Sequence, residues 1–436
     1  MDWKQYYQEH QMTAEDAVKQ IKSGDRVIIG HAVGEPCHLV EAMVNNAAAY
    51  QDVEVVHMVP MGQCVYCQPE YEGHFRHNSF FIGPKSRKAL EEGRSDYIPC
   101  FFFEIPRLFD KELPLDVALI QVTPPDENGK MSLGVSVDYT YSAAKKAKIT
   151  IAQVNPQMPR TFGTYLEVKD IDTFVLWDEP ILELPAPKIG PIEEAIGKNV
   201  ASLIQNGDAM QLGIGAIPDA ILRFLHDKKD LGIHTETFSD GVVELAKAGV
   251  INNSAKKIHV GKIEATMMMG TRKLYDFVNN NPDVELYPVE YSNHPATIAK
   301  NENVISINSA IEVDLTGQVN AEAIGSRQFS GIGGQLDYVR GAALASNGRS
   351  VIAMPSTTKG ISKIVTELGA GAVVTTTRCD VDYVVTEYGI AKLKGQSLRS
   401  RARRLIAVSH PDHRPELIAY YEKRFHEVYN AEEHKK

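Results

Sequence analysis

Cysteine is scarce in this chain of 436 residues, and long apolar runs are absent. The N-terminus, Met1-Asp-Trp-Lys-Gln-Tyr-Tyr7, lacks the apolar segment of a secretory signal. No stretch approaches the roughly 20 apolar residues that a membrane span needs. An odd, sparse cysteine set predicts reduced thiols rather than a disulfide scaffold. The chain is therefore expected to be cytoplasmic, and its five cysteines are Cys37, Cys64, Cys67, Cys100 and Cys379.

Excess positive charge is also missing. The formal net charge is -10, which argues against a nucleic-acid partner. A small anionic ligand remains possible, because its binding depends on the local field. The basic stretch Ser400-Arg-Ala-Arg-Arg404 is interpreted as the solvated face of a helix.

Metal-ligand spacing is absent too. Cys64-Val-Tyr-Cys67 is a CxxC pair, but no second ligand pair lies nearby in the sequence, as a zinc site would require. A redox motif would be expected at the start of a helix, and Pro69 follows almost at once. We interpret the two residues as structural thiols and expect no metal site.

What the sequence does contain is an alternation of apolar strands and amphipathic helices. Strands are predicted at 26–30, 53–59, 116–122 and 149–154, and helices at about 39–49 and 143–147. A glycine-containing loop, His31 to Pro36, follows the first strand. This alternation predicts an α/β fold built from βαβ units with a mostly parallel sheet.

The second half repeats the pattern of the first. Both halves contain a helix, a Gly-Asp pair, an apolar strand, a glycine loop, a proline and a helix. The Gly-Asp pairs begin at Gly24 and Gly207, and the loop glycines are Gly30 and Gly213, so both offsets are 183 residues. A later turn, Asp126-Glu-Asn-Gly129, has a counterpart in Asp314-Leu-Thr-Gly317.

The repeat predicts two related α/β domains, 1–186 and 192–436. The proline-rich stretch 184–191 is interpreted as the linker between them. Ligands of open α/β sheets bind beyond the carboxyl ends of the strands, so a cleft between the two domains is the expected active site.

Two glycine-rich stretches are candidate ligand loops. Gly213-Ile-Gly-Ala-Ile-Pro-Asp219 lies between a strand and a helix predicted at 220–225. Glycine lets the backbone approach a ligand, and a helix N-terminus offers N–H groups to an anion. A tight structural turn is the alternative. Ser330-Gly-Ile-Gly-Gly-Gln-Leu-Asp337 is the second cluster, with a plain flexible loop as its alternative.

Four polar residues are weaker candidates on their own. Glu236 stands in Gly232-Ile-His-Thr-Glu-Thr-Phe-Ser-Asp-Gly241, where an isolated glutamate is usually a surface residue. Lys359 follows a strand in a loop of small residues and suits a phosphate or carboxylate. Asn293 precedes His-Pro and is either a turn residue or an amide donor. Glu387 has no partner that the sequence identifies.

Together these motifs resemble the acetyl-CoA hydrolase/transferase family of class I CoA-transferases. The resemblance covers nearly the whole chain and rests on motifs in a consistent order: Ser23-Gly-Asp25, Gly213 to Asp219, His234-Thr-Glu236, Ser239-Asp-Gly241, Ser292-Asn-His-Pro295, Gly331-Ile-Gly-Gly334 and Thr386-Glu-Tyr-Gly389. It implies two related α/β domains of the CoA-transferase type.

The resemblance also implies roles for individual residues. Glu236 would form a glutamyl-CoA thioester, and Asn293 and Gly334 would supply the oxyanion hole. The other residues implied to contact coenzyme A are Gly213, Ile214, Gly215, Ala216, Ile217, Ala310, Ile311, Ser330, Gly331, Gly333 and Lys359.

The activity implied is transfer of coenzyme A between a short-chain acyl-CoA and a small carboxylate such as 4-hydroxybutyrate, butyrate, propionate or acetate. Coenzyme A would be a substrate, with no tightly bound cofactor, and the protein would form a homodimer. Three alternatives remain: an acyl-CoA hydrolase using the same glutamate, a non-catalytic CoA-binding module, and, from the α/β pattern alone, a sugar-phosphate isomerase with Glu236 as base.

Overall fold

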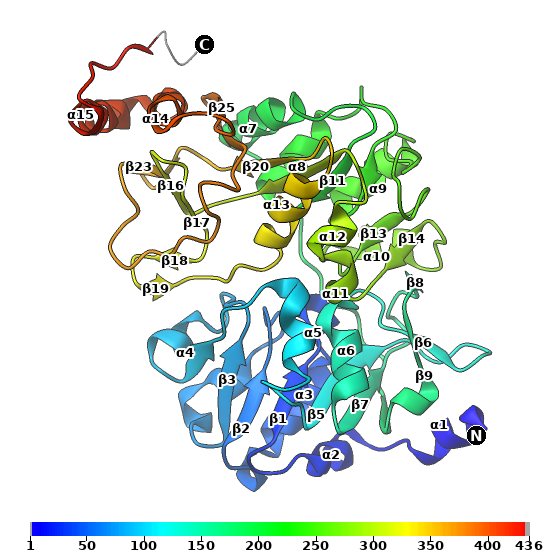
Figure 1. Cartoon of the computed structure of the whole chain (residues 1–436). Coiled ribbons are helices and arrows are strands. Elements are labelled where there is room, and N and C mark those ends of the chain that lie inside the picture. Colours follow the sequence, from blue (N-terminus) through cyan, green and yellow to red (C-terminus); the bar gives the residue numbers. More distant parts are fainter. Residues whose placement is uncertain (1, 432–436) are drawn as a thin grey trace. The chain divides into compact units, whose positions relative to one another are not determined.

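The computed structural model describes residues 2–431 and divides into two compact units (Figure 1). The N-terminal unit contains Met1–Pro185 and Glu264–Asn293, and the C-terminal unit contains Ala186–Ile263 and His294–Lys436. The predicted domain boundaries, 1–186 and 192–436, remain a prediction. In the compact units, Glu264–Asn293 groups with the N-terminal segment. No helix in the described part of the chain is long and apolar enough to span a membrane.

The N-terminal unit is built on a seven-stranded sheet in the order β10-β7-β5-β1-β2-β3-β4. All neighbouring strands in it are parallel. Its strands are β1 (Arg26–Ile29), β2 (Val53–Val56), β3 (Phe75–Ser79), β4 (Ser95–Tyr97), β5 (Val117–Val122), β7 (Ile149–Val154) and β10 (Thr173–Leu176).

Helices and short strands complete this unit. The helices are α1 (Trp3–Glu9), α2 (Ala14–Ala17), α3 (Cys37–Asn45), α4 (Arg87–Glu91), α5 (Ile105–Leu108), α6 (Asp138–Lys146), α10 (Arg272–Val278) and α11 (Val289–Ser292). The short strands are β6 (Lys130–Ser132), β8 (Phe162–Gly163), β9 (Tyr165–Glu167), β13 (Ile263–Ala265) and β14 (Val284–Leu286). Apolar side chains of α2, α3, β1, β2 and β5 form one buried core.

The C-terminal unit has a six-stranded sheet in the order β12-β11-β15-β20-β24-β25. Only the edge strand β25 runs antiparallel to its neighbour. The strands are β11 (Ala209–Leu212), β12 (Gly232–Ile233), β15 (Val304–Asn308), β20 (Arg349–Ala353), β24 (Tyr383–Thr386) and β25 (Gly389–Lys392).

Seven helices are described in this unit: α7 (Pro191–Ala201), α8 (Ala216–Arg223), α9 (Asp240–Lys247), α12 (Pro295–Ile298), α13 (Gln335–Leu344), α14 (Leu398–Ala407) and α15 (Arg414–Phe425). Its short strands are β16 (Glu312–Asp314), β17 (Val319–Asn320), β18 (Ala323–Ile324), β19 (Arg327–Gln328), β21 (Thr357–Thr358), β22 (Ile361–Ser362) and β23 (Ile364–Val365). The α/β class with mostly parallel sheets is confirmed.

The internal repeat is visible in the strand order. The strands β10-β7-β5-β1-β2 of one unit correspond in order to β24-β20-β15-β11-β12 of the other. Strand β11 begins and ends 183 residues after β1, the offset found in the sequence. The paired turns also match, because Asp126 Oδ1 accepts the N–H groups of residues 128 and 130, and Asp314 Oδ1 those of residues 316 and 318.

Two helices begin earlier than the sequence analysis indicated. Helix α8 begins at Ala216 rather than Ala220, with Pro218 in its first turn. Proline is tolerated there because the first N–H groups of a helix have no helical acceptor. Helix α7 begins at Pro191, inside the stretch interpreted as a linker, for the same reason.

Close packing of α7 on α8 fixes the start of α8. A Cβ at Gly197 would lie 2.8 Å from the backbone carbon of Ala220. Replacement of glycine by alanine inside a helix normally stabilises it by up to about 1 kcal/mol. At Gly197 the clash with backbone outweighs that gain.

Gly197→Ala is therefore expected to destabilise the protein by about 1–3 kcal/mol, the usual result of overpacking. Urea unfolding should show a lower midpoint for the variant. Lys198→Ala, on the exposed side of the same helix, is the matched control and should leave the midpoint nearly unchanged. A Gly197→Ala midpoint at or above that of the parent would contradict this packing.

Candidate active site

The predicted site residues of the C-terminal unit gather at one edge of its sheet. Strands β12, β11 and β15 are neighbours and parallel, so their carboxyl ends lie at the same edge. Glu236 follows β12, the loop Gly213–Gly215 follows β11, and Ala310 and Ile311 follow β15. This is the edge at which open α/β sheets bind ligands.

Glu236 lies in a half-buried bend whose neighbours are firmly held. The hydroxyl of Thr235 lies 2.9 Å from the carbonyl oxygen of Leu212, the residue that ends β11. On the other side, His234 is buried, and its Nδ1 lies 3.0 Å from the amide nitrogen of Asn301. These contacts place the Glu236 bend directly beside the start of the glycine loop.

The glycine loop Gly213–Gly215 opens helix α8. Gly215 has φ +117° and ψ -173°, a conformation that is essentially restricted to glycine. The N–H groups of Ala216 and Ile217 follow in the first helical turn, where backbone donors have no helical acceptor. Such donors can bind an anion.

The start of α9 is bound to the same helix. Ser239, the N-cap residue of α9, donates its hydroxyl to Asp219 Oδ1 over 2.8 Å. A Cβ at Gly241 would lie 2.6 Å from the Leu222 side chain, so glycine there permits the close approach of α8 and α9. The segment that follows the Glu236 bend is therefore held against α8.

Helix α13 brings the second glycine cluster to the same region. Its side chain Gln335 donates to the carbonyl oxygen of Ser309 over 3.2 Å, beside the predicted Ala310–Ile311 contact. Tyr338, one turn into α13, packs edge-on against the ring of His234 with 6.0 Å between ring centroids. Gly334 is the N-cap residue of this helix.

Ahead of α13, the predicted Ser330–Gly334 loop makes a tight bend. The hydroxyl of Ser330 donates to the carbonyl oxygen of Ala321 over 2.9 Å. Gly331, Gly333 and Gly334 are buried, and Gly333 has φ +53°, which favours glycine. In this conformation the cluster forms a tight turn that leads into α13.

Two predicted residues lie elsewhere. Lys359 is exposed at the tip of the β21–β22 hairpin, where it and Gly360 have φ +51° and +79°. Asn293 belongs to the N-terminal unit, where it is fully buried and ends α11.

Sequence reasoning left Glu387 without a partner, and the structure supplies one. Both the backbone N–H and the hydroxyl of Ser356 donate to its carboxylate, over 2.9 and 2.6 Å. Nearby, burial lowers the pKa of Lys363 to about 8, and the charge of Glu387 opposes that shift. The contact joins the carboxyl ends of β20 and β24, and no local sequence signal connects residues 31 positions apart.

A polar cluster after β1 and β2 of the N-terminal unit was also missed. Glu35 Oε2 accepts the N–H groups of Gly62 and Met61 over 2.8 and 3.1 Å. Burial raises the pKa of Glu35 to about 7, although the two hydrogen bonds act in the opposite direction and lower it. His57 Nε2 lies 3.8 Å from Glu35 Oε2. Burial lowers the pKa of His57 well below its usual value, which favours the neutral imidazole and so disfavours an ion pair with Glu35.

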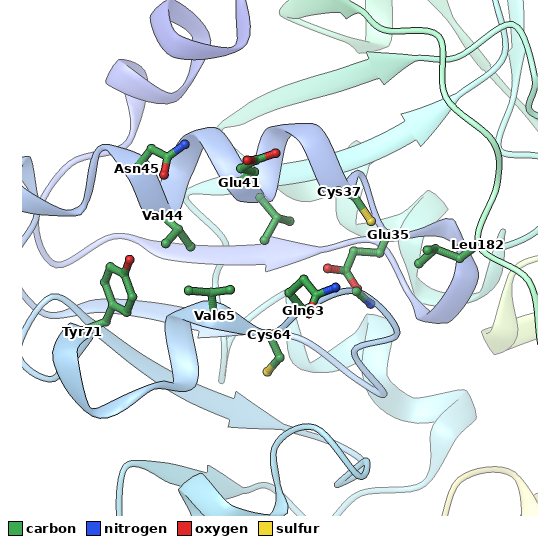
Figure 2. Close-up of a pocket in the computed structure, with 12 residues that line it drawn as sticks. Glu35, Cys37, Glu41, Val44, Asn45, Gln63, Cys64, Val65, Tyr71 and Leu182 are labelled. Atoms are coloured by element: carbon green, nitrogen blue, oxygen red, sulfur yellow. The ribbon is translucent and has the colours of Figure 1, made fainter.

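Glu35 borders a cavity of about 430 Å³ within this unit. Figure 2 shows the cavity between one face of α3, which carries Glu41, and the segment from Gln63 to Tyr71. Within residues 2–431, no group of three or more histidine, cysteine, aspartate or glutamate side chains is arranged to hold a metal ion.

Comparison with known proteins gives a consistent result across the chain. Residues 1–183 match the family model of the acetyl-CoA hydrolase/transferase N-terminal domain, and residues 270–421 match that of the C-terminal domain. The 4-hydroxybutyrate coenzyme A transferase of Clostridium kluyveri is 56% identical over 429 residues, covering 98% of this chain and 100% of that protein.

Solved structures agree with the fold. The 4-hydroxybutyrate CoA-transferase of Porphyromonas gingivalis is 40% identical with a TM-score of 0.85, covering 97% of this chain and 100% of that one. RipA from Yersinia pestis is 35% identical with a TM-score of 0.93, covering 98% and 100%. Because both family models match and a relative of this similarity spans nearly the entire sequence, the protein is an enzyme of the acetyl-CoA hydrolase/transferase family.

Proposed function

We propose that the protein is a CoA-transferase that moves coenzyme A between a short-chain acyl-CoA and a small carboxylate through a thioester on Glu236. The observation that supports this most directly is the position of Glu236 beside the Gly213–Gly215 loop, held by the contact of Thr235 with Leu212. A carboxylate nucleophile next to N–H groups suited to an anion is the arrangement that such a reaction requires.

In the proposed reaction, a carboxylate oxygen of Glu236 attacks the acyl-CoA carbonyl carbon. The carbon–sulfur bond breaks, giving an acyl-glutamyl anhydride and the CoA thiolate. The thiolate attacks the glutamyl carbonyl and forms the enzyme thioester, and the first acid leaves. The acceptor carboxylate reverses these steps. No water is consumed, so the free energy of the thioester is conserved.

Each step passes through an oxyanion that needs hydrogen-bond donors. We assign that role to the Asn293 amide and a backbone N–H at Gly334. Loss of one such donor typically costs about 100- to 1000-fold in rate. Coenzyme A is assigned to Gly213, Ile214, Gly215, Ala216, Ile217, Ala310, Ile311, Ser330, Gly331, Gly333 and Lys359.

For the acids, we propose the 4-hydroxybutyrate, butyrate or acetate class. The name of the Clostridium kluyveri relative, which specifies 4-hydroxybutyrate, supports this choice. Coenzyme A acts as a substrate in this scheme, and a homodimer is the proposed assembly.

The first prediction from the proposed function concerns the nucleophile. Glu236→Gln removes the carboxylate but keeps the shape of the side chain. Acyl transfer from butyryl-CoA to acetate should fall by roughly 1000-fold or more, the scale of loss for essential nucleophiles. Binding of coenzyme A, measured by calorimetry, should remain.

Glu244→Gln is the matched control, since Glu244 lies on the exposed side of α9, eight residues further along. It should retain full transfer activity. Equal activity of Glu236→Gln and the control would reject Glu236 as nucleophile.

The second prediction concerns the glycine loop. A Cβ at Gly215 would meet no atom within 4 Å, so Gly215→Ala acts through the backbone alone. Strain of about 1–3 kcal/mol should displace the loop and raise the KM for acyl-CoA about 5- to 150-fold. Steady-state kinetics with acetate saturating would measure it.

Gly249→Ala is the control for backbone strain. Gly249 also has a positive φ, +73°, and open space around its Cβ position, but it follows the far end of α9. It should leave the KM for acyl-CoA unchanged. A similar KM change in both variants would mean that the effect is one of general stability.

The third prediction separates transfer from hydrolysis. Loss of butyryl-CoA without an acceptor acid should be much slower than with acetate or 4-hydroxybutyrate present. Thioester absorbance and product chromatography measure both rates. Equal rates would favour the acyl-CoA hydrolase alternative.

A further inference from the structure

Two buried cysteines lie in contact at the edge of the cavity in the N-terminal unit. Cys64 and Cys67 are 1% and 4% exposed, and their sulfur atoms are 3.1 Å apart. The short helix Val65–Cys67 (η4) joins them, with Cys64 as its N-cap residue and a bond from the Cys67 N–H to the Cys64 carbonyl. The sulfurs already face each other, so little movement separates the dithiol from a disulfide.

The surroundings of the pair favour a thiolate on Cys67 that accepts a hydrogen bond from the Cys64 thiol. The hydrogen bond that the Cys64 thiol donates lowers the pKa of Cys67, while burial opposes the shift and the neighbouring His77 assists it. Ser95 connects these groups, with its hydroxyl 3.9 Å from the Cys67 sulfur and 3.2 Å from His77 Nδ1. A lowered thiol pKa is typical of cysteines that react with oxidants, whereas purely structural thiols are inert.

The segment that carries the pair also borders the cavity of this unit. Gly62, Gln63, Cys64 and Val65 line the cavity, and Glu35 binds the N–H of Gly62. In Figure 2 the Cys64 side chain lies on the side of the cavity opposite α3, with its sulfur directed away from that helix. A cavity of about 430 Å³ admits hydrogen peroxide or a small organic hydroperoxide.

Backbone strain marks the segment as well. Val59 and Cys64 have φ +49° and +52°, in the left-handed region that non-glycine residues rarely adopt. The repeat adds a topological parallel. Val27 pairs with Val55, and Met210, 183 residues later, pairs with Ile233, so the segment after β2 is the counterpart of the segment that carries Glu236.

We propose that Cys64 and Cys67 form a reversible dithiol–disulfide site that small hydroperoxides oxidise. One sulfur attacks the hydroperoxide as a thiolate. A sulfur–oxygen bond forms, the oxygen–oxygen bond breaks, and water or an alcohol leaves with a proton. The second sulfur attacks the resulting sulfenic acid, the sulfur–sulfur bond forms, and the hydroxyl leaves as water. Two thiols and one hydroperoxide thus give one disulfide, one alcohol or water, and one water.

A zinc site is a poorer explanation of the pair. Tetrahedral zinc needs three or four protein ligands, and in residues 2–431 no such group is arranged to bind a metal. The interpretation of the two cysteines as inert structural thiols also explains the site less well. It does not account for the contacts that join Cys67 to Ser95 and Ser95 to His77.

The test uses the full-length protein, reduced and then treated with one equivalent of hydrogen peroxide. It is denatured, alkylated and cleaved after glutamate. Cleavage after Glu54 and Glu70 releases fragment 55–70, which contains Cys64 and Cys67 and no other cysteine. The expected fragment carries no alkyl group and is lighter than the dithiol form by two hydrogen atoms. Dithiothreitol before alkylation should restore both alkylation sites.

Cys379→Ser removes the one cysteine that is exposed and should leave the oxidation of fragment 55–70 unchanged. In Cys64→Ser, oxidation of Cys67 should stop at the sulfenic acid, because the second thiol that forms the disulfide is missing. Fragment 55–70 that stays doubly alkylated while Cys379 is oxidised would overturn the proposal. So would oxidation of either thiol to a form that dithiothreitol does not reverse. Both results come from the parent protein, so they hold even where a variant fails to fold.

Discussion

The parallel pairing of β12, β11 and β15 is the constraint on which the candidate site depends. Parallel neighbours end at the same edge, so three loops that are far apart in sequence emerge together. The contact between Thr235 and Leu212 then fixes the Glu236 bend against the first of these loops. Without that pairing, Glu236 would be one more half-buried carboxylate on a turn.

Glycine turns this edge into a surface that a ligand can approach. Gly215 adopts a conformation closed to other residues, and Gly241 allows α9 to pack against α8. Gly197 likewise allows α7 to pack against α8. The position of the first turn of α8 therefore follows from close packing as much as from the loop itself.

Much of this arrangement could be predicted from sequence because the signals are local or repeated. The β1 and β11 bounds agree with the 183-residue offset, and Asp126 and Asp314 hold equivalent turns. What could not be predicted depends on distant contacts or on the tolerance of a first helical turn for proline. Pro218 lies inside α8 instead of ahead of it, and Glu387 finds its partner on another strand.

The N-terminal unit shows how far one scaffold can diverge. Its loops after β1 and β2 carry Glu35 and the Cys64–Cys67 pair, where the C-terminal unit has the glycine loop and Glu236. Equivalent strand ends thus present different chemistry, since parallel strands fix where a loop emerges but not which residues it carries.

A peptide mass map after mixing the protein with butyryl-CoA and no acceptor acid tests the central claim most directly. Tryptic fragment 230–247 contains Glu236, and fragmentation distinguishes it from Glu244. The proposed mechanism predicts a CoA adduct on Glu236 that added acetate discharges. An unmodified Glu236 during continued turnover of butyryl-CoA would contradict it.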